Sequence, residues 1–496
     1  MSSVIISQPS TPPATPAATH VQTPRSNPIS KALVPILVGV GIGLIPAPAG
    51  LAPNAWRYFA LFAAVIVGLV TEPIPAAAVG LLGVVVAGIS GWVSPEPAKA
   101  IAWTLGGFSN TTIWLIFAAY TFAHGYSKTG LGRRIALQLI KRLGGRTLGL
   151  GYAVAIADLA LSPFTPSNTA RSGGTIYPII ENVPPLYGSA PGATSKKMGA
   201  YLLYTALAAT TVTSSIFLTS QAPNVLAASL AAKTANISYT WTEWFMGFLP
   251  VGVLLFLMVP ALLYWTYPPE IKTAPEAPKW AAEELSKIGP MSRKEYSLLA
   301  IVVIVLALWI GATKYADTTM VALVAVAAMV VFRIISWDDV LANKQAWNVL
   351  VWFATLVTLA GGLAQVKFVD WLGKALAPKF HGMPVVAAIV LLTGAYFFLH
   401  YLFASTTAHA TALFPVFLTV ALKLPGLSPK GWALMLAYPL GLIGILTPYA
   451  TGPSPIYYGS GYIKGRDFWV YGAILGAIYF LALMTIGISW LHFIGM

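Results

Sequence analysis

The sequence contains no cysteine and very few charged residues. Without cysteine the chain has no disulfide, no thiolate metal site, no thioether-linked haem and no cysteine nucleophile. Only 9% of its 496 residues are charged, against about 25% in ordinary globular proteins, whereas 57% are hydrophobic. A soluble fold of this length has too much surface to cover with so few charges. The composition therefore predicts an integral membrane protein.

Acidic residues are the scarcest of the charged ones: 15 Asp and Glu stand against 29 Lys and Arg, a net charge of +14. In a soluble protein this excess would suggest nucleic-acid binding. Here the basic residues lie mostly in short connectors between apolar stretches, as in the loops on the inner side of a membrane. We therefore expect no nucleic-acid partner, and a multi-pass protein of the bacterial inner (plasma) membrane.

Residues 1–30 form a tail rich in Ser, Thr, Pro and Ala, which predicts disorder. A polar, Pro-rich tail ahead of the first apolar run is not typical of a cleavable signal. The first acidic residue is Glu72, which leaves an organellar presequence open, although the tail is not amphipathic.

The rest of the chain alternates apolar segments with short connectors. Each segment is near the ~20 residues needed to cross a bilayer, which predicts an all-α polytopic fold. The first half, 31–266, and the second half, 296–496, are joined by a polar linker, 267–295, that carries five of the fifteen acidic residues. The expected apolar segments are 32–50, 56–72, 75–94, 109–127, 147–165, 197–219, 244–266, 296–314, 317–335, 346–365, 383–403, 408–423, 431–450 and 467–491.

A basic stretch at 127–147 interrupts this pattern, with Ile and Leu at helical spacing among six Lys and Arg residues. We interpret it as an amphipathic helix along the cytoplasmic interface. A ligand-binding basic patch is the alternative.

The two halves repeat each other at an offset of 238 positions, without a gap. Trp and Asn match by chance less readily than Ala or Leu, so an internal duplication is predicted, of the kind that is often inverted in transporters. A less basic counterpart of the amphipathic helix, at 365–382, fits a second copy that faces outward. The matched residues are Asn110 and Asn348, Trp114 and Trp352, Gly144 and Gly382, Ser167 and Ser405, Thr169 and Thr407, and Ala170 and Ala408.

The repeat contains a pair of polar motifs, SPFTPSNTARSGG at 162–174 and FASTTAHATALFP at 403–415, each after an apolar run. Pro163 and Pro166 predict that the first helix breaks there, and broken helices occur at membrane depth only inside protein or beside a cavity. Two helix breaks supply free N–H groups and positive dipole ends, which suit a compact, multiply negative ligand such as a dicarboxylate. The alternative is a Ser/Thr cluster that holds helices together.

Each motif has a cation four residues after its matched Ser, namely Arg171 in the first and His409 in the second. Arg can bind a carboxylate through two hydrogen bonds, and His can be a neutral donor or a cation. The alternatives are an interfacial anchor for Arg171 and a packed, hydrogen-bonded histidine for His409. We expect a bound dianion to neutralise this charge, and an empty carrier to retain an unpaired Arg171 that hinders its return. Asp158 can be a proton relay or a hydrogen-bonding partner.

Each half has a second polar break, at 217–224 and 446–455. Both follow an apolar run and contain proline, so we expect them to form the other walls of the two half-sites. The residues expected to support the site from these breaks are Thr219, Gln221, Thr447 and Gly452.

These motifs resemble the divalent anion/sodium symporter (DASS) family, in particular its exchanger branch of citrate/succinate, tartrate/succinate and 2-oxoglutarate/malate translocators. The resemblance rests on SNTAR with its following Gly pair, on HYLFASTTAHATALFP and on SQAPN, and extends over residues 30–496. It implies an inverted-repeat homodimer with about eleven spans and two re-entrant hairpins, which works as an elevator. The residues implied to contact substrate are Ser167, Asn168, Thr169, Ser405, Thr406, Thr407 and Thr451.

The second triplet departs from the family pattern, because Thr406 stands where Asn is expected. Losing an amide oxygen weakens one sodium site, while Arg171 and His409 bring positive charge. We therefore predict sodium-independent exchange of dicarboxylates or tricarboxylates, without cofactor or metal. A sodium- or proton-coupled symporter of the same fold is the alternative. The sequence lacks the motifs of a membrane enzyme. Two convergent half-sites suit occlusion of a ligand better than the continuous pore of a channel.

Overall fold

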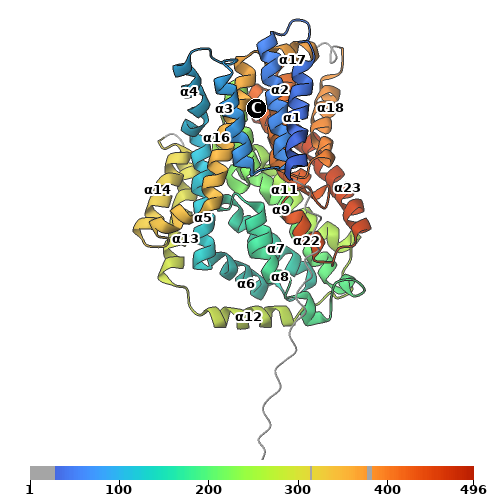
Figure 1. The fold of residues 1–496 in the computed structure, drawn as a ribbon. Helices are drawn as coiled ribbons and strands as arrows, with labels where there is room; N and C mark the ends of the chain where they lie inside the picture. The colour runs from blue at the N-terminus through green and yellow to red at the C-terminus, as the bar shows by residue number, and fades with distance from the viewer. Residues whose placement is uncertain (1–27, 313–314, 377–381) are drawn as a thin grey trace, which may run out of the picture.

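The computed structural model describes residues 28–312, 315–376 and 382–496, which are helical with short connections (Figure 1). Most of the predicted tail, 1–30, lies outside these ranges, as do small parts of the predicted segments 296–314 and 365–382. The predicted all-α polytopic fold is confirmed. The helices that are long and apolar enough to cross a membrane are 53–71, 147–164, 241–266, 293–311, 344–365, 385–402 and 465–493; four shorter apolar helices are 31–44, 76–89, 318–331 and 406–421.

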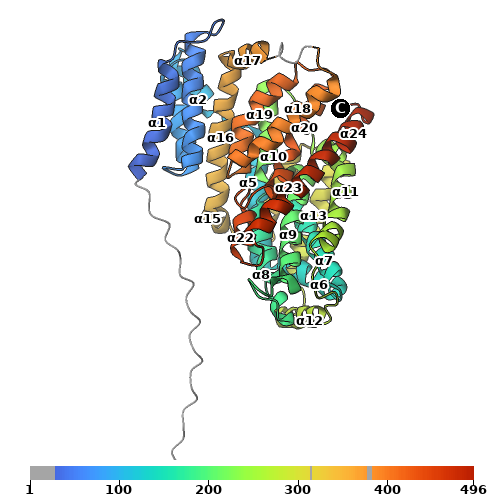
Figure 2. The ribbon, with the colours of Figure 1, turned by 90° about the vertical axis from the view of Figure 1, so that its right-hand side faces the viewer.

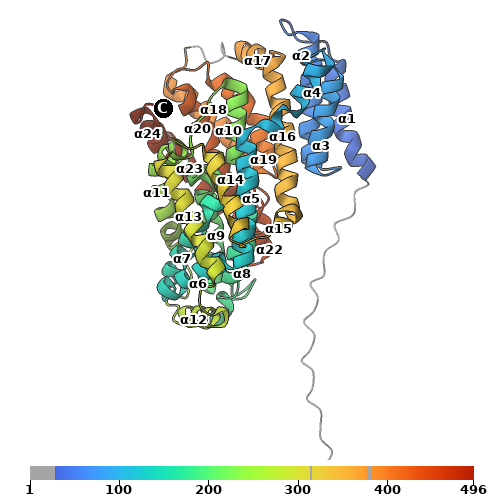
Figure 3. The same ribbon diagram turned by 90° about the vertical axis from the view of Figure 1, so that its left-hand side faces the viewer.

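The first four helices form a separate layer along one side of the molecule (Figures 2 and 3). The layer packs on α16, where the Tyr58 hydroxyl donates to the Leu359 carbonyl at 2.7 Å. Its outer side exposes apolar residues such as Leu37 and Leu82, which suits contact with lipid tails. These elements are α1 (Pro28–Leu44), α2 (Pro53–Thr71), α3 (Ala76–Ile89), α4 (Pro97–Leu105) and α16 (Lys344–Gln365).

The internal repeat is visible in the order of the helices that follow. In each half a long helix leads into a short amphipathic helix and then into an apolar helix that ends at a polar break. The two sets are α5 (Thr111–Thr129), α6 (Leu131–Leu143) and α7 (Thr147–Leu161), and α16, α17 (Phe368–Leu376) and α18 (Val385–Phe398). Since α6 and α17 lie at opposite ends of the molecule (Figures 1 and 2), the two copies are inverted.

The predicted amphipathic helix is α6. Its apolar face, with Leu137 and Ile140, is buried, and α6 lies beside α12 (Glu276–Ile288) at one end of the molecule (Figure 1). The buried Arg134 guanidinium pairs with Glu295 at 2.6 Å, across the end of the predicted linker. The linker is therefore an ordered part of the fold that ties the two halves together.

Helix α9 is the most deeply buried of the remaining long helices, and all of its residues are buried. The helix packs against α7 and α11 of the first half and against α21 of the second. These elements are α8 (Tyr177–Ile180), α9 (Gly199–Ile216), α10 (Ala222–Ala235), α11 (Trp241–Thr266), α13 (Arg293–Gly311), α14 (Thr318–Val331), α15 (Trp337–Ala342), α19 (Thr406–Ala421), α20 (Pro429–Ala437), α21 (Pro439–Leu442), α22 (Pro453–Gly459), α23 (Gly465–Ala482) and α24 (Ile488–Phe493). The core thus joins both halves.

An ion pair between α5 and α15 gives a pH-dependent prediction. Lys128 donates to the Asp339 carboxylate, which also accepts from Ser336, and both hold the pKa of Asp339 well below its usual value. Because its pKa is lower in the folded state, ionised Asp339 stabilises the fold at pH values above its unfolded pKa of about 3.9. This stabilisation is lost as the pH falls through the folded-state pKa. For this partly exposed pair we expect Asp339→Asn to cost no more than about 1 kcal/mol. Thermal unfolding in detergent should give a constant difference from wild type between about pH 7 and 5, shrinking below about pH 4. A difference that vanishes already at about pH 6 would contradict the assignment.

Candidate functional site

The first polar motif breaks its helix as predicted. Helix α7 ends at Leu161, a 3-10 turn covers Ser162–Phe164, and the chain resumes as a π-helix at Thr169–Ile176. Pro163 and Pro166 have no N–H to donate, which explains why the α-helix does not continue. A π-helix is rare and often marks a functional site.

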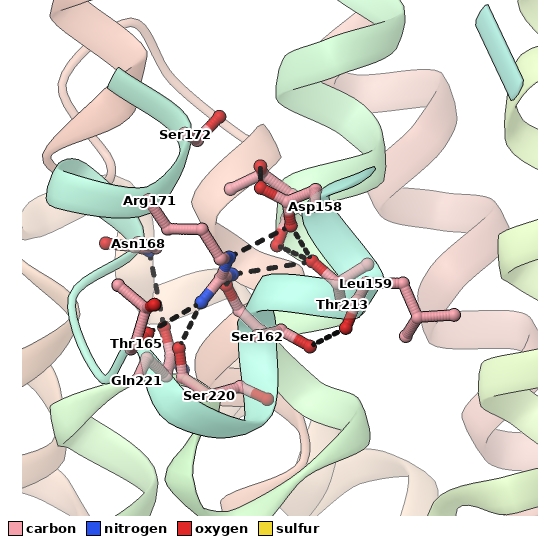
Figure 4. Close-up of polar contacts among 12 residues, drawn as sticks. Asp158, Leu159, Ser162, Thr165, Asn168, Arg171, Ser172, Thr213, Ser220 and Gln221 are labelled. Atoms are coloured by element: carbon pink, nitrogen blue, oxygen red, sulfur yellow. Dashed lines mark hydrogen bonds and ion pairs between the residues drawn. The ribbon is translucent and has the colours of Figure 1, made fainter. Parts of the chain in front are cut away.

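Arg171 lies in this π-helix, and its guanidinium is fully buried (Figure 4). Three nitrogens donate hydrogen bonds to groups from four segments of the chain. These groups are the Asp158 carboxylate at 3.1 Å, the Thr165 carbonyl at 2.9 Å, the Ser220 carbonyl at 2.5 Å, Ser214 Oγ at 3.0 Å and Thr213 Oγ1 at 3.4 Å. Arg171 therefore holds the broken segments of the first half together.

The carboxylate that neutralises Arg171 is also buried. Asp158 lies on α7 and accepts from Thr210 at 2.8 Å and from Thr213, both on α9 (Figure 4). Asp158 is thus an ion-pair and hydrogen-bonding partner. The hypothesis that an empty carrier keeps an unpaired Arg171 is wrong for this structure, because a resident carboxylate balances the guanidinium.

Asn168 connects the first motif to the second half. Its amide donates to Thr451 Oγ1 at 2.9 Å and to Gln221 Oε1 at 3.4 Å. Thr169 packs against Gly452 so closely that a β-carbon built on the glycine would overlap Thr169 Oγ1. Three of the four predicted breaks therefore meet at one place, although 283 residues separate Asn168 from Thr451.

The second motif starts helix α19. Ser405 is its N-cap and accepts from the Ala408 N–H at 3.3 Å, with Thr406 and Thr407 buried in the first turn. The α19 N-terminus therefore presents backbone N–H groups beside short hydroxyls, an arrangement that attracts anions. The turn just before the motif reaches the common place through His400, whose Nε2 lies 3.0 Å from the carbonyl oxygen of Ala450, next to Thr451.

His409 differs sharply from its repeat counterpart Arg171. Its imidazole is fully buried against the rings of Tyr396, His400 and Phe403, at centroid distances of 4.5, 5.1 and 5.2 Å. Among the described residues neither ring nitrogen has a hydrogen-bond partner. His409 is therefore packed, as the alternative expected, but the expectation that its ring is hydrogen-bonded is wrong within the described residues.

Of the residues predicted to support the site, Thr219 and Gln221 have hydrogen-bond partners, and Thr447 has none among the described residues. Thr219 donates to the Pro163 carbonyl at 2.5 Å and accepts from Trp241, so it braces the first break from behind. Gln221 donates to Asn224 at 2.8 Å. Thr447 is buried, and its hydroxyl has no partner in the part of the chain that the structure describes.

Sequence reasoning missed a group of hydroxyl residues around Arg171. Thr210, Thr213 and Ser214 lie on α9, and Ser220 follows it. The run TTVTSS at 210–215, inside an otherwise apolar helix, was the signal for them. His400 was also missed; its position at the end of an apolar run, just before the second motif, was the signal for it.

The assembled site offers neutral donors and helix N-termini, with one neutralised ion pair behind them. Within the described ranges no group of three or more His, Asp or Glu side chains lies close enough to hold a metal ion. The arrangement suits binding of a small oxyanion by hydrogen bonds.

Comparison with known sequences gives extensive matches. Residues 26–496 match the family model described as the sodium:sulfate symporter transmembrane region. The L-tartrate/succinate antiporter of Shigella sonnei (strain Ss046) is 47% identical over 472 residues, which cover 92% of this chain and 97% of that protein. The L-tartrate/succinate antiporter of Escherichia coli (strain K12) matches with the same identity and coverage.

Two solved transporter structures share the fold at low sequence identity. The YdaH transporter of Alcanivorax borkumensis superposes with a TM-score of 0.58 at 14% identity, over 80% of this chain and 89% of that one. MtrF of Neisseria gonorrhoeae gives 0.53 at 9% identity, over 93% and 94%. At such identities the likeness concerns the fold alone.

Proposed function

The chain belongs to the sodium:sulfate symporter family, and from that premise we propose that it exchanges C4 dicarboxylates of the tartrate and succinate class across the bacterial inner membrane, without sodium. Relatives with 47% identity over nearly their whole length are L-tartrate/succinate antiporters. The observation that carries the proposal is the meeting, at one buried place, of Asn168, Thr451 and His400, which lies in the turn just before α19. We propose that the activity of this site is transport rather than catalysis.

The proposed ligands of the two carboxylates come from both halves. The Asn168 amide and the Thr451 hydroxyl face each other at 2.9 Å, and a carboxylate oxygen can accept from either. The α19 N-terminus, with Ser405, Thr406 and Thr407, provides N–H and hydroxyl donors for the other carboxylate. Ser167 and Thr169 complete the first half-site.

Arg171 is proposed to replace a sodium ion rather than to bind substrate. It donates to the carbonyl oxygens of Thr165 and Ser220 at 2.9 and 2.5 Å, one from each break of the first half. Carbonyl and hydroxyl oxygens of this kind are the ligands that hard cations prefer. Since a permanently charged guanidinium already satisfies them, coupling to sodium is unnecessary at this half-site.

Since Arg171 is paired, something other than an unpaired arginine must prevent the empty carrier from returning and so make exchange obligatory. Without an anion the first N–H groups of α19 have no acceptor within the helix, and each buried unsatisfied polar group costs about 1–3 kcal/mol. We propose that this cost hinders the return of the empty carrier. Movement as an elevator in a homodimer, with the breaks in the moving part, completes the proposal.

Transport by purified protein in proteoliposomes tests the proposal. We expect uptake of labelled succinate only when the vesicles contain unlabelled succinate or L-tartrate, and at the same rate with and without a sodium gradient. A sodium gradient that drives uptake into vesicles without internal dicarboxylate would instead establish the symporter of the same fold.

The matched variants are Asn168→Ala and Asn182→Ala. The Asn168→Ala variant lacks the amide that donates to Thr451 and Gln221. Because a hydrogen bond to a charged group contributes about 1.5–3 kcal/mol, we expect a tenfold to hundredfold loss of apparent affinity. Asn182 is exposed and donates only to the nearby Pro178 carbonyl, so its variant should transport normally. Equal loss in both would contradict the proposed site.

A further inference from the structure

Two buried histidines lie next to each other behind the second motif. The rings of His400 and His409 are 5.1 Å apart, and both side chains are fully buried. Three of their four ring nitrogens have no partner among the described residues, namely His400 Nδ1 and both nitrogens of His409. Buried polar atoms are nearly always hydrogen-bonded, so an unpartnered cluster calls for a functional explanation.

The tautomer of His400 follows from its one contact. Nε2 lies 3.0 Å from the Ala450 carbonyl oxygen, which can only accept, so Nε2 carries the hydrogen. Nδ1 is then an unprotonated acceptor. A proton added to the pair can therefore reside on His409 or on His400 Nδ1.

The surroundings of His409 can tolerate a positive charge. The rings of Tyr396 and Phe403 lie 4.5 and 5.2 Å from the imidazole, within the ~6 Å at which aromatic rings attract cations. Burial without a counter-ion still opposes protonation. The pair should therefore remain neutral until an anion arrives nearby.

No resident anion serves as that counter-ion in the described part of the chain. The helices packed against α19 include α2, α10, α16, α17, α18, α20 and α21. Their charged residues are Arg57, Lys233, Lys344, Asp370, Lys374 and Lys430; all are exposed except Lys430, which pairs with Glu243 at 2.6 Å. The titratable phenols on these helices are Tyr58, which donates to Leu359, and Tyr396; Tyr438, at the start of α21, donates to Trp244.

We propose that the His400–His409 pair binds one proton together with each dicarboxylate. The inference rests on the proposed function. The backbone N–H of His409 donates to the Ser405 carbonyl at 3.0 Å, in the first turn of α19, and this bond holds His409 directly behind the Ser405 cap. A carboxylate at the α19 N-terminus therefore lies about one helical turn from the imidazole. The anion supplies the missing counter-charge, and the proton comes from solvent without any other covalent bond being made or broken.

The pair is also connected to the first half-site. His400 donates to Ala450, and the next residue, Thr451, accepts from Asn168. A proton on the pair therefore strengthens the hydrogen bond that positions the second break. This contact makes His400 a positioning residue, whereas His409 lies nearest the proposed ligand.

Calorimetric titration of L-tartrate into the purified full-length protein near neutral pH tests the inference. Both carboxyls of tartrate are ionised at this pH, so any proton taken up binds to the protein. Repeating the titration in two buffers of different ionisation enthalpy gives the number of protons bound per tartrate, by linkage. We expect uptake approaching one proton, decreasing toward higher pH. Tartrate binding without proton uptake between about pH 6 and 8 would overturn the inference.

Three variants test whether the proton binds to the His400–His409 pair. His409→Gln and His400→Gln should both bind tartrate with strongly reduced proton uptake, while His492→Gln, in the last helix α24, should match wild type. Undiminished uptake in both His400→Gln and His409→Gln would overturn the inference. Since His409 is tightly packed, His400→Gln gives the decisive value if the other variant does not fold. If wild-type protein binds no dicarboxylate at all, it is the proposed function that fails.

Discussion

Replacing Arg171 by alanine is expected to destabilise the protein by about 3–5 kcal/mol and to abolish exchange. The substitution leaves the Asp158 carboxylate buried without its counter-ion, which is the costly way to break a buried ion pair. It also removes the donors to the Thr165 and Ser220 carbonyls, so the two breaks of the first half lose their common support. Thermal unfolding in detergent and exchange in proteoliposomes measure the two effects.

A double-mutant cycle separates the ion pair from simple loss of packing. Asp158→Asn and Arg171→Gln should each be strongly destabilising, and the double variant should be less unstable than the sum of the two, because neither charge is then left alone. The control is Arg133→Ala on α6, which breaks a partly exposed pair with Glu284 at 2.8 Å and should cost no more than about 1 kcal/mol. Strict additivity of the two buried substitutions would refute the coupling.

Replacing Gly452 by alanine is the second substitution with a large expected effect. The new β-carbon would overlap Thr169 Oγ1 and lie 3.0 Å from the Thr169 β-carbon, so the first and second half-sites must move apart. Overpacking of this kind costs typically about 1–3 kcal/mol, and because the strain falls on the proposed ligands we expect a tenfold to hundredfold loss of apparent affinity for tartrate. Concentration-dependent exchange in proteoliposomes gives this affinity.

The chain offers a rescue and a matched control for that substitution. Thr169→Ala removes the hydroxyl responsible for the closest approach, so it should partly restore affinity in the Gly452→Ala background, whereas Thr169→Ser keeps that oxygen and should not. Gly459 lies at the C-terminal end of α22, the helix that Gly452 caps, and an added β-carbon there meets nothing within 4 Å. Gly459→Ala should therefore transport like wild type. A normal Gly452→Ala variant would show that Thr169 and Gly452 do not meet in the transporting protein.

The helices and their breaks were largely predictable because each has a local cause. Apolar runs of membrane-spanning length gave the long helices, and the prolines at 163 and 166 gave the end of α7. The repeat offset of 238 positions predicted a second break at Ser405, where α19 begins. Short helices without a long apolar run, such as α4 and α22, were not predicted, because hydropathy alone does not distinguish them from connectors.

The partners of the site residues were not predictable, because they come from distant parts of the chain. Arg171 and His409 occupy equivalent positions in the repeat, and the sequence therefore suggested equivalent roles. The structure gives Arg171 a carboxylate, two carbonyls and two hydroxyls, and gives His409 a set of aromatic rings. Whether a buried cation is free or neutralised depends on packing of α7 against α9, which no local pattern records.

The sequence by itself determined that this is a polytopic membrane protein, and it predicted a duplicated pair of helix breaks as a site for anions. Composition, segment length and the repeat are properties of the chain that hold in any arrangement of its helices. Only the tertiary structure decided that Asp158 neutralises Arg171, that Asn168 meets Thr451, and that His400 lies beside His409. The physical reason is that a charge or a hydrogen-bonding group in a low-dielectric interior acts according to its nearest partners, and folding brings those partners together from opposite halves of the chain.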